Sequence, residues 1–115
     1  MQYALLIHGA ESAMQNITEA QAGQILSAYG AYSEALRKAG VLLGNNRLRP
    51  TSDATTVRVV NGKTEVLNGP YAETREQFAG YYLIDVPDLD AALSWAARCP
   101  GASFGSVEVR PIWMM

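Results

Sequence analysis

The chain has 115 residues, of which 49% are apolar, and this length and composition predict a single globular domain over residues 1–115. Its formal net charge of −2 argues against binding to nucleic acid or to an anionic membrane surface. The one cysteine, Cys99, excludes an internal disulfide and suits a reducing compartment. No basic segment precedes the first apolar run and no apolar run reaches about 18 residues. We therefore expect a cytoplasmic protein without a signal peptide or membrane span.

The first half of the chain predicts a strand, a long helix and a second strand. Residues 3–8 (YALLIH) form a short apolar run that is typical of a buried strand. Thr18 and Gln21 have the spacing of a capping box, which predicts the start of a helix, and Gly40 predicts its end. Residues 41–50 (VLLGNNRLRP) predict a strand that ends at a proline. The apolar side chains of the helix recur at helical spacing: Ile25, Tyr29, Tyr32, Leu36 and Ala39.

The second half predicts a hairpin, two more strands and a second helix. Two β-branched runs flank Asn61-Gly62 (residues 61–62), a pair that favours a hairpin with a primed turn. Residues 78–86 (FAGYYLIDV) predict an apolar strand, and Asp88 is expected to cap a helix over residues 89–99. Residues 105–113 (GSVEVRPIW) alternate in polarity and contain a proline, which is typical of an edge strand. The inward stripe of the second helix is expected at Leu89, Ala92, Leu93 and Ala96.

The order of these elements predicts an α+β fold of the ferredoxin-like βαββαβ type with an inserted β-hairpin. The predicted strands 3–8 and 78–86 are apolar on both faces, although two helices would cover only one face of the sheet. An exposed apolar face of this kind marks an interface. We therefore expect a homodimer in which two sheets meet face to face, forming a dimeric α+β barrel.

Two residues are candidates for catalysis. His8 is the only histidine and ends the first predicted strand, where an imidazole in a cleft could act as a general base near neutral pH. The alternative is a half-buried histidine with a backbone partner. Asp85 interrupts an apolar strand, and a buried carboxylate needs a partner or a raised pKa. The alternative for Asp85 is a strand-end carboxylate that faces water.

Residues 68–77 (NGPYAETREQ) are longer and carry more polar side chains than a simple connection between two strands needs. We expect an ordered loop at the rim of a cleft, with Thr74 and Gln77 as a second capping box that starts a helical turn. Such a turn would present backbone N–H groups and Arg75 to an anionic ligand group. We also expect one of the two loop glutamates to pair with an arginine, either for ligand binding or only to pin the loop.

Other side chains are candidates for ligand binding, each with a structural alternative. Two arginines alternate with Leu48 on a predicted strand, so they share one side of it and could hold an acidic ligand or lie on a solvated face. Tyrosines near the loop could contact an aromatic ligand. The candidate ligand-binding residues are Arg47, Arg49, Tyr71, Glu73, Arg75 and Tyr82.

Several common sites are missing from the sequence. One histidine and one cysteine cannot build a zinc site of the usual kind. The sequence contains no phosphate-binding loop, no dinucleotide fingerprint and no G-x-S-x-G elbow. Cys99 is expected at a helix C-terminus, where the dipole raises a thiol pKa and disfavours a nucleophile. We therefore expect no metal and no cofactor.

Residues 68–76, NGPYAETRE, carry a family resemblance that extends to ALLIHGAES at the start and VEVRPI at the end. The chain resembles the YCII-related family, in its DGPF-domain branch, which is named for an Asp-Gly-Pro-Phe motif followed by Ala-Glu-Thr-Lys-Glu. Tyr71 and Arg75 are conservative changes within the motif. Asn68 replaces its first carboxylate, which removes an acid-base group if relatives use it there and changes little if it only shapes the turn.

The resemblance implies a dimeric α+β barrel with a cleft between sheet and helices for a small molecule. YCII-type proteins are thought to use a His-Asp pair, which has no residue-by-residue match in this sequence. Two functions follow as hypotheses. The first is a cofactor-independent enzyme of isomerase, lyase or oxygenase type. The second is a non-catalytic ligand-binding or regulatory module, since DGPF proteins resemble partners of extracytoplasmic-function sigma factors.

Overall fold

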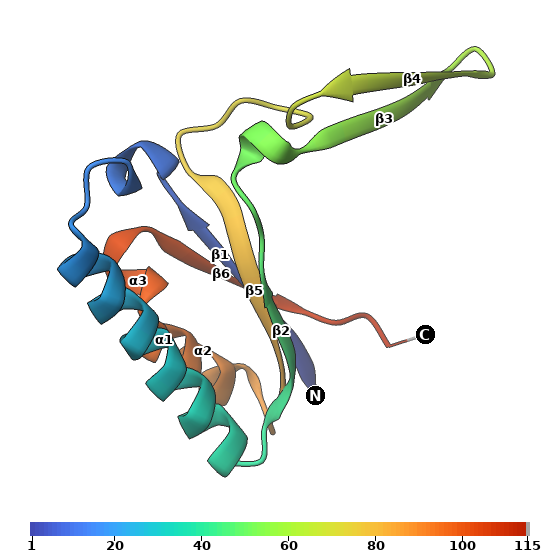
Figure 1. The fold of residues 1–115 in the computed structure, drawn as a ribbon. Helices are drawn as coiled ribbons and strands as arrows, with labels where there is room; N and C mark the ends of the chain where they lie inside the picture. Colours follow the sequence, from blue (N-terminus) through green and yellow to red (C-terminus); the bar gives the residue numbers. More distant parts are fainter. Residues whose placement is uncertain (115) are drawn as a thin grey trace.

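A computed structural model of the chain describes residues 1–114 as an α+β fold with a four-stranded sheet, a separate two-stranded ribbon and helices on one side (Figure 1). The strands are β1 (Gln2–Gly9), β2 (Leu42–Arg47), β3 (Thr55–Val60), β4 (Lys63–Asn68), β5 (Gln77–Asp85) and β6 (Ser106–Pro111). The α-helices are α1 (Glu19–Lys38), α2 (Leu89–Arg98) and the short α3 (Gly101–Phe104). Two 3-10 turns, η1 (Glu11–Met14) and η2 (Thr51–Asp53), complete the elements.

The main sheet has the strand order β2-β5-β1-β6, and all of its neighbouring strands are antiparallel. The N-terminal strand β1 therefore lies inside the sheet, between β5 and β6, which come from the second half of the chain. The predicted edge position of residues 105–113 is confirmed, because β6 has only β1 beside it. A register shift between Ile7 and His8 marks an irregularity where β1 passes Phe78.

The core lies between the sheet and the two long helices. Leu5 and Ile84 are fully buried on the face of β1 and β5 that meets helix α1, where Leu36 is also fully buried. Ala92 and Ala96 of α2 close the same layer. Their small side chains allow α2 to approach the sheet closely. This face of the sheet carries the hydrophobic core of the described residues.

The helix ends form as the sequence predicts. The Thr18 hydroxyl accepts a hydrogen bond from the Gln21 backbone N–H, and the Gln21 side chain accepts one from the Thr18 N–H, so the capping box is complete. Gly40 has a φ of +73°, the left-handed conformation that ends a helix. Asp88 accepts a hydrogen bond from the Ala91 N–H at the start of α2.

The predicted inward stripe of α2 is wrong at two of its four positions. Leu89 and Leu93 are each 47% exposed, whereas Ala92 and Ala96 are buried. Trp95 packs partly against the core, and its backbone carbonyl accepts a hydrogen bond from the Tyr32 hydroxyl. The helix is thus rotated so that a large aromatic ring and two alanines face the sheet, which leaves the leucines on the surface.

The face of the sheet turned away from the helices is called the open face here. The register places Ala4, Leu6, Tyr81 and Leu83 at its centre, because Ala4 pairs with Leu83 and Leu6 with Tyr81. Polar side chains border this apolar centre. Glu108 and Arg110 of β6 flank it on one side and Asn46 of β2 on the other.

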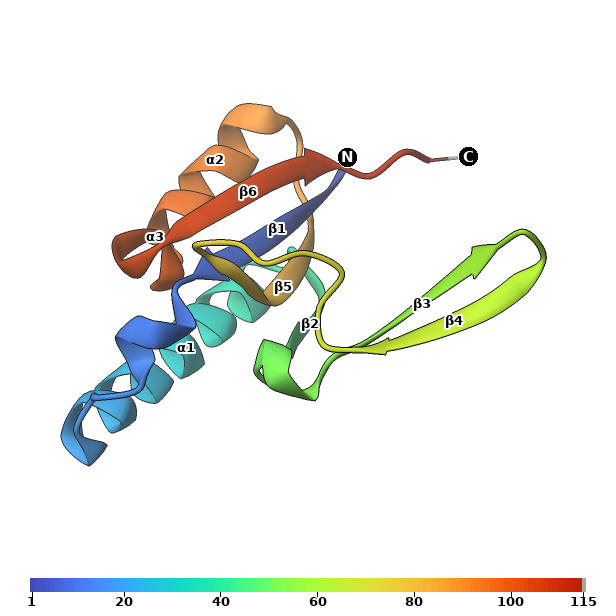
Figure 2. The same ribbon diagram turned by 90° about the horizontal axis from the view of Figure 1, so that it is seen from above.

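The hairpin formed by β3 and β4, residues 55–68, is called the arm. Its turn residues Asn61 and Gly62 have φ values of +50° and +76°, which confirms the primed turn predicted from the sequence. Figures 1 and 2 show the arm leaving the sheet on the side away from the helices and reaching well beyond the main sheet. In the part of the chain that the structure describes, no helix is long and apolar enough to cross a membrane.

Candidate functional site

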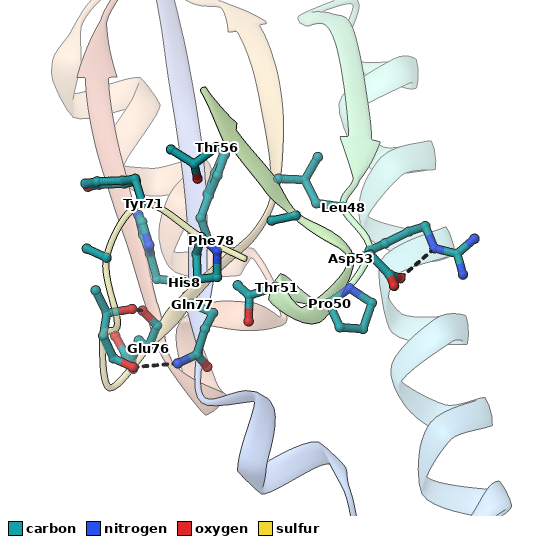
Figure 3. Close-up of a pocket in the computed structure, with 15 residues that line it drawn as sticks. His8, Leu48, Pro50, Thr51, Asp53, Thr56, Tyr71, Glu76, Gln77 and Phe78 are labelled. Carbon is teal, nitrogen blue, oxygen red and sulfur yellow. Dashed lines mark hydrogen bonds and ion pairs between the residues drawn. The ribbon is translucent and has the colours of Figure 1, made fainter. Parts of the chain in front are cut away.

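A surface pocket of about 500 Å³ lies where the arm meets the sheet. Its walls come from the end of β1, the start of β5, the connection between β2 and β3, and the loop before β5. Figure 3 shows its labelled side chains gathered around this hollow. The lining includes His8, Leu48, Thr51, Thr56, Tyr71 and Phe78.

His8 brings an imidazole to the wall of this pocket, at the end of the open face. Its Nε2 atom lies 3.4 Å from Oε1 of Glu108, and its ring packs against Phe78 with 5.4 Å between the ring centroids. The side chains of His8 and Glu108 are 29% and 51% exposed, so the pair lies at the surface. Arg110 approaches the other carboxylate oxygen of Glu108 at 3.9 Å. A carboxylate beside one ring nitrogen orients an imidazole and leaves its second nitrogen for another partner.

Glu108 was missed in the sequence because its relation to His8 depends on strand register. His8 pairs with Ser106 across the ladder between β1 and β6, so Glu108, two residues further on, shares the face of His8. The alternating pattern of residues 105–113 shows which side chains share a face of the strand, but it identifies the neighbour of His8 only when the pairing of β6 with β1 is known.

Gly105 has no side chain, and this allows the start of β6 to lie against the backbone at the end of β1. A Cβ atom built on Gly105 would overlap with the carbonyl oxygen of His8 and would reach Gly9. The position therefore requires glycine for space and not for a left-handed φ. This close approach helps to fix the backbone that carries the imidazole.

The loop between the arm and β5 forms the outer rim of the pocket but not in the predicted conformation. Thr74 donates its hydroxyl to the Glu76 carbonyl, and the Gln77 side-chain amide donates to the Thr74 carbonyl. No helical turn forms here, so the predicted capping box of Thr74 and Gln77 is wrong. The side-chain bonds satisfy carbonyls instead of backbone N–H groups, and the expected anion-binding turn is absent from the described loop.

The glutamates of the loop also behave differently from the prediction. Glu76 accepts a hydrogen bond of 2.8 Å from the Ser106 hydroxyl and forms no ion pair with an arginine among residues 1–114. Glu73 and Arg75 are exposed and lie outside the pocket lining. The predicted ion pair of Glu73 or Glu76 with an arginine is therefore wrong.

Glu11 joins two walls of the pocket, a role that no sequence signal indicated. Its carboxylate accepts hydrogen bonds from the backbone N–H and the hydroxyl of Thr51, at 2.8 and 3.0 Å. Its own backbone N–H donates to the Gln77 side chain at 2.8 Å. The segment after β1, the turn η2 and the start of β5 are thus tied together at one residue.

The candidate ligand-binding residues do not lie together. Tyr71 and Arg49 line the pocket, although Arg49 is already paired with Asp53 at 2.9 Å. Arg47 and Arg49 border a neighbouring, shallower hollow of about 310 Å³. Arg47 forms no ion pair within residues 1–114, so its guanidinium is available to an acidic group there.

Two predicted site residues lie away from the pocket. Tyr82 is only 4% exposed and faces helix α1, where its hydroxyl and that of Ser33 are 2.7 Å apart. Asp85 pairs with Gln2, whereas His8 pairs with Phe78, so the two catalytic candidates lie at opposite ends of their strands. The Asp85 carboxylate instead binds the N-terminal ammonium group at 3.1 Å. Tyr82 and Asp85 are therefore not pocket residues.

A buried cluster of phenols and one thiol lies beneath α1 and α2. Burial, as the largest cause, raises the pKa of the hydroxyl groups of Tyr29, Tyr32 and Tyr82 and of the Cys99 thiol. The raised thiol pKa agrees with the expectation for Cys99, but desolvation is its leading cause, not the helix dipole. These groups stabilise the packed layer in their neutral forms. Among residues 1–114, no cluster of three His, Cys, Asp or Glu side chains could hold a metal ion.

Comparison with known families agrees with this description of fold and sequence. The model of the YCII-related domain matches residues 1–115. The chain belongs to the YCII-related domain family. It is similar to an uncharacterised protein of Rhizobium meliloti (strain 1021), with 40% identity over 114 residues that cover 97% of this chain and 92% of the relative. The family resemblance seen in the sequence is thereby confirmed, and it assigns no reaction.

Proposed function

We propose that this YCII-related protein binds a small molecule in the pocket at the root of the arm, and that His8 exchanges a proton with that molecule in a cofactor-independent reaction. The observation that carries the proposal is the His8 imidazole in the wall of a pocket of about 500 Å³, with the Glu108 carboxylate 3.4 Å from its Nε2 atom. Pockets of about 300–1,000 Å³ hold most small ligands.

The side chains that line the pocket indicate which class of small molecule it could bind. Phe78, Tyr71 and Leu48 supply apolar and aromatic surface. The hydroxyls of Thr51 and Thr56 already donate to Glu11 and to the Gly69 carbonyl, so they are not free donors. A weakly acidic aromatic molecule that keeps its proton at neutral pH fits best, such as a phenol. Its ring would stack on the aromatic wall while an acidic proton meets the imidazole.

The test is a panel of small acids and phenols, screened by thermal shift and followed by assays for turnover of each hit. A true ligand at a hundredfold excess over its dissociation constant stabilises the protein by about 2.7 kcal/mol. With a hit in hand, His8→Gln should abolish turnover while Tyr71→Ala weakens binding. Tyr82→Phe, in the core, is the matched control and should leave affinity unchanged. Unaltered binding in both pocket variants would reject this pocket as the site.

Ligand binding without turnover is the second candidate function. It is favoured by the exposure of the His8–Glu108 pair, because water at 29% and 51% exposed side chains weakens their electrostatic influence on a reacting group. The same screen separates the two functions. A ligand that binds through Tyr71 and is recovered chemically unchanged identifies a binding module, and a converted ligand identifies an enzyme.

We further infer a homodimer built on the open face, as in a dimeric α+β barrel. Two observations support this inference: the strand order β2-β5-β1-β6 is compatible with a ferredoxin-like sheet, and the apolar centre of the open face has no helix over it. Leu83→Lys should convert the protein to a monomer in light scattering. Leu93→Lys, an equally sized change on the exposed side of α2, is the control and should leave the dimer intact. A monomeric native protein at micromolar concentration would reject the inference.

A further inference from the structure

The arm exposes a row of aliphatic side chains along one of its two faces. Register pairs Val57 with Val66 and Val59 with Thr64, so these side chains point to the same side of the ribbon. Val57, Val59 and Val66 are 59%, 67% and 62% exposed. The opposite side of the same ribbon carries the charged pair Arg58 and Glu65 at its centre, with Val60 and Leu67, 45% and 47% exposed, towards its two ends. The centre of the arm is therefore aliphatic on the valine side and charged on the other.

A two-stranded ribbon of this kind is marginally stable by itself in water. The arm has no third strand and no helix packed against it in the described chain. Three exposed valines on a projecting ribbon also offer a surface for unspecific association. A partner that covers the valine side would stabilise the ribbon and would shield the valines from unspecific association.

The dimensions of the chain agree with an uncovered interface. Its accessible surface of 8236 Å² is about one third more than the roughly 6,100 Å² expected for a compact monomer of 12.4 kDa. Its radius of gyration of 16.1 Å exceeds the roughly 13 Å of a compact domain of this length. The surplus surface is larger than the roughly 800 Å² that each partner contributes to a standard interface.

The direction of the arm indicates which molecule could cover its valine side. Figures 1 and 2 agree that the arm projects on the side of the sheet away from the helices, which is the side of the open face. A molecule seated on the apolar centre of the open face would lie beside the arm. The open face and the arm therefore border the same space, and a second copy of this chain would supply its own open face and arm in return.

We propose that the valine side of the arm packs on a second copy of this chain, so that each protomer embraces the other, and that the partner closes the pocket at the arm's root. His8 and Glu108 lie on the open face at its pocket end, so a protomer seated on this face borders the pocket. Closure would shield the pair from water. The closure rests on the proposed function of the pocket, whereas the packing of the arm does not.

The test compares two double variants in the same part of the ribbon. Val57→Ser with Val66→Ser removes a paired set from the valine side, and Arg58→Ser with Glu65→Ser removes the adjacent pair from the opposite side. We expect the first variant to raise the dimer dissociation constant at least tenfold in analytical ultracentrifugation and the second to change it less than threefold. An unchanged constant in the valine variant, or equal weakening in both, would overturn the packing of the arm.

A second measurement avoids dependence on a variant that unfolds the ribbon. A spin label on Val59→Cys should be immobilised in the dimer, whereas a label on Val60→Cys, which points to the opposite side, should stay mobile. Cys99 is buried and should escape labelling. Equal mobility at both positions would contradict the proposal.

Pocket closure has its own readout. With a ligand from the screen, affinity should fall at least fivefold when the valine variant is diluted to monomer and should recover at concentrations that restore the dimer. Affinity independent of dimerisation would overturn the closure while leaving the arm contact intact. A native dimer that binds no member of the panel would instead reject the proposed function of the pocket.

Discussion

Gly105 packs so closely on His8 that any side chain at position 105 would overlap with the His8 carbonyl oxygen. We expect Gly105→Ala to destabilise the protein by about 1–3 kcal/mol, because β6 must shift away from β1 to make room for the methyl group. Urea denaturation measures the loss. The His8 ring resonances in NMR should move as well, since the same backbone carries the imidazole.

Gly30→Ala is the control for Gly105→Ala. Gly30 lies within helix α1, and a Cβ atom there would meet nothing within 4 Å. Gly30→Ala should stabilise the protein by about 0.5–1 kcal/mol, because alanine loses less backbone entropy than glycine in a helix. Equal effects of the two substitutions would show that contact with His8 does not determine the requirement at position 105.

Removal of the Glu11 carboxylate should loosen the pocket. Glu11→Ala deletes both hydrogen bonds to Thr51, and we expect a loss of about 1.5–3 kcal/mol, the range for hydrogen bonds to a charged group. Amide exchange should accelerate at Thr51 and its neighbours. Glu73→Ala serves as the control. Its side chain is exposed in the loop and makes no bond in the described chain, so a change within about 0.5 kcal/mol is expected.

The turn of the arm should be sensitive to a β-branched residue. Gly62 has a φ of +76°, a region that costs an L-residue about 1–2 kcal/mol and a β-branched one more. Gly62→Val should therefore speed hydrogen exchange of the arm amides while those of β1 and β5 keep their protection. Asn61→Gly retains the backbone conformation and should be far milder. Uniform loss of protection across both sheets would contradict a local effect.

Alkaline pH should destabilise the protein through the phenols and the thiol packed beneath α1 and α2. Because burial raises the pKa of Tyr29, Tyr32 and Cys99 in the fold, the unfolded chain releases these protons first as pH rises. Their contribution to stability is full below about pH 9, the start of the range of ordinary values for Cys (9.0) and Tyr (10.0), and is lost above it. Denaturation at pH 7 and pH 10 measures the loss, which Tyr29→Phe should reduce.

Features with a local cause could be read from the sequence. The Asp88 cap, the Thr18–Gln21 capping box and the turn at Asn61-Gly62 each depend on residues no more than three apart. Their hydrogen bonds and backbone angles are set by neighbouring atoms of the chain. The strands and helices predicted around them are accordingly present in the structure with small differences at their ends.

Most of the errors concern relations between distant segments, whereas the failed cap of Thr74 is a local one. The rotation of α2, which exposes Leu93, depends on the fit of Trp95 beside Tyr32. The pairing of His8 with Glu108 depends on the register of strands 100 residues apart in the chain. Tyr81 and Tyr82 are neighbours in sequence, yet only the sheet's contacts decide which of them enters the core. In the loop, Thr74 had carbonyl partners within reach, which competed with the expected cap.

The central place of β1 has a consequence for how the molecule is made. Its neighbours β5 and β6 begin at Gln77 and Ser106, so a nascent chain cannot complete the sheet until residues 77–111 have left the ribosome. Pairings that span most of the chain must also close large loops before they become favourable, which slows folding. Until then the apolar stretch YALLIH has neither of its partner strands beside it.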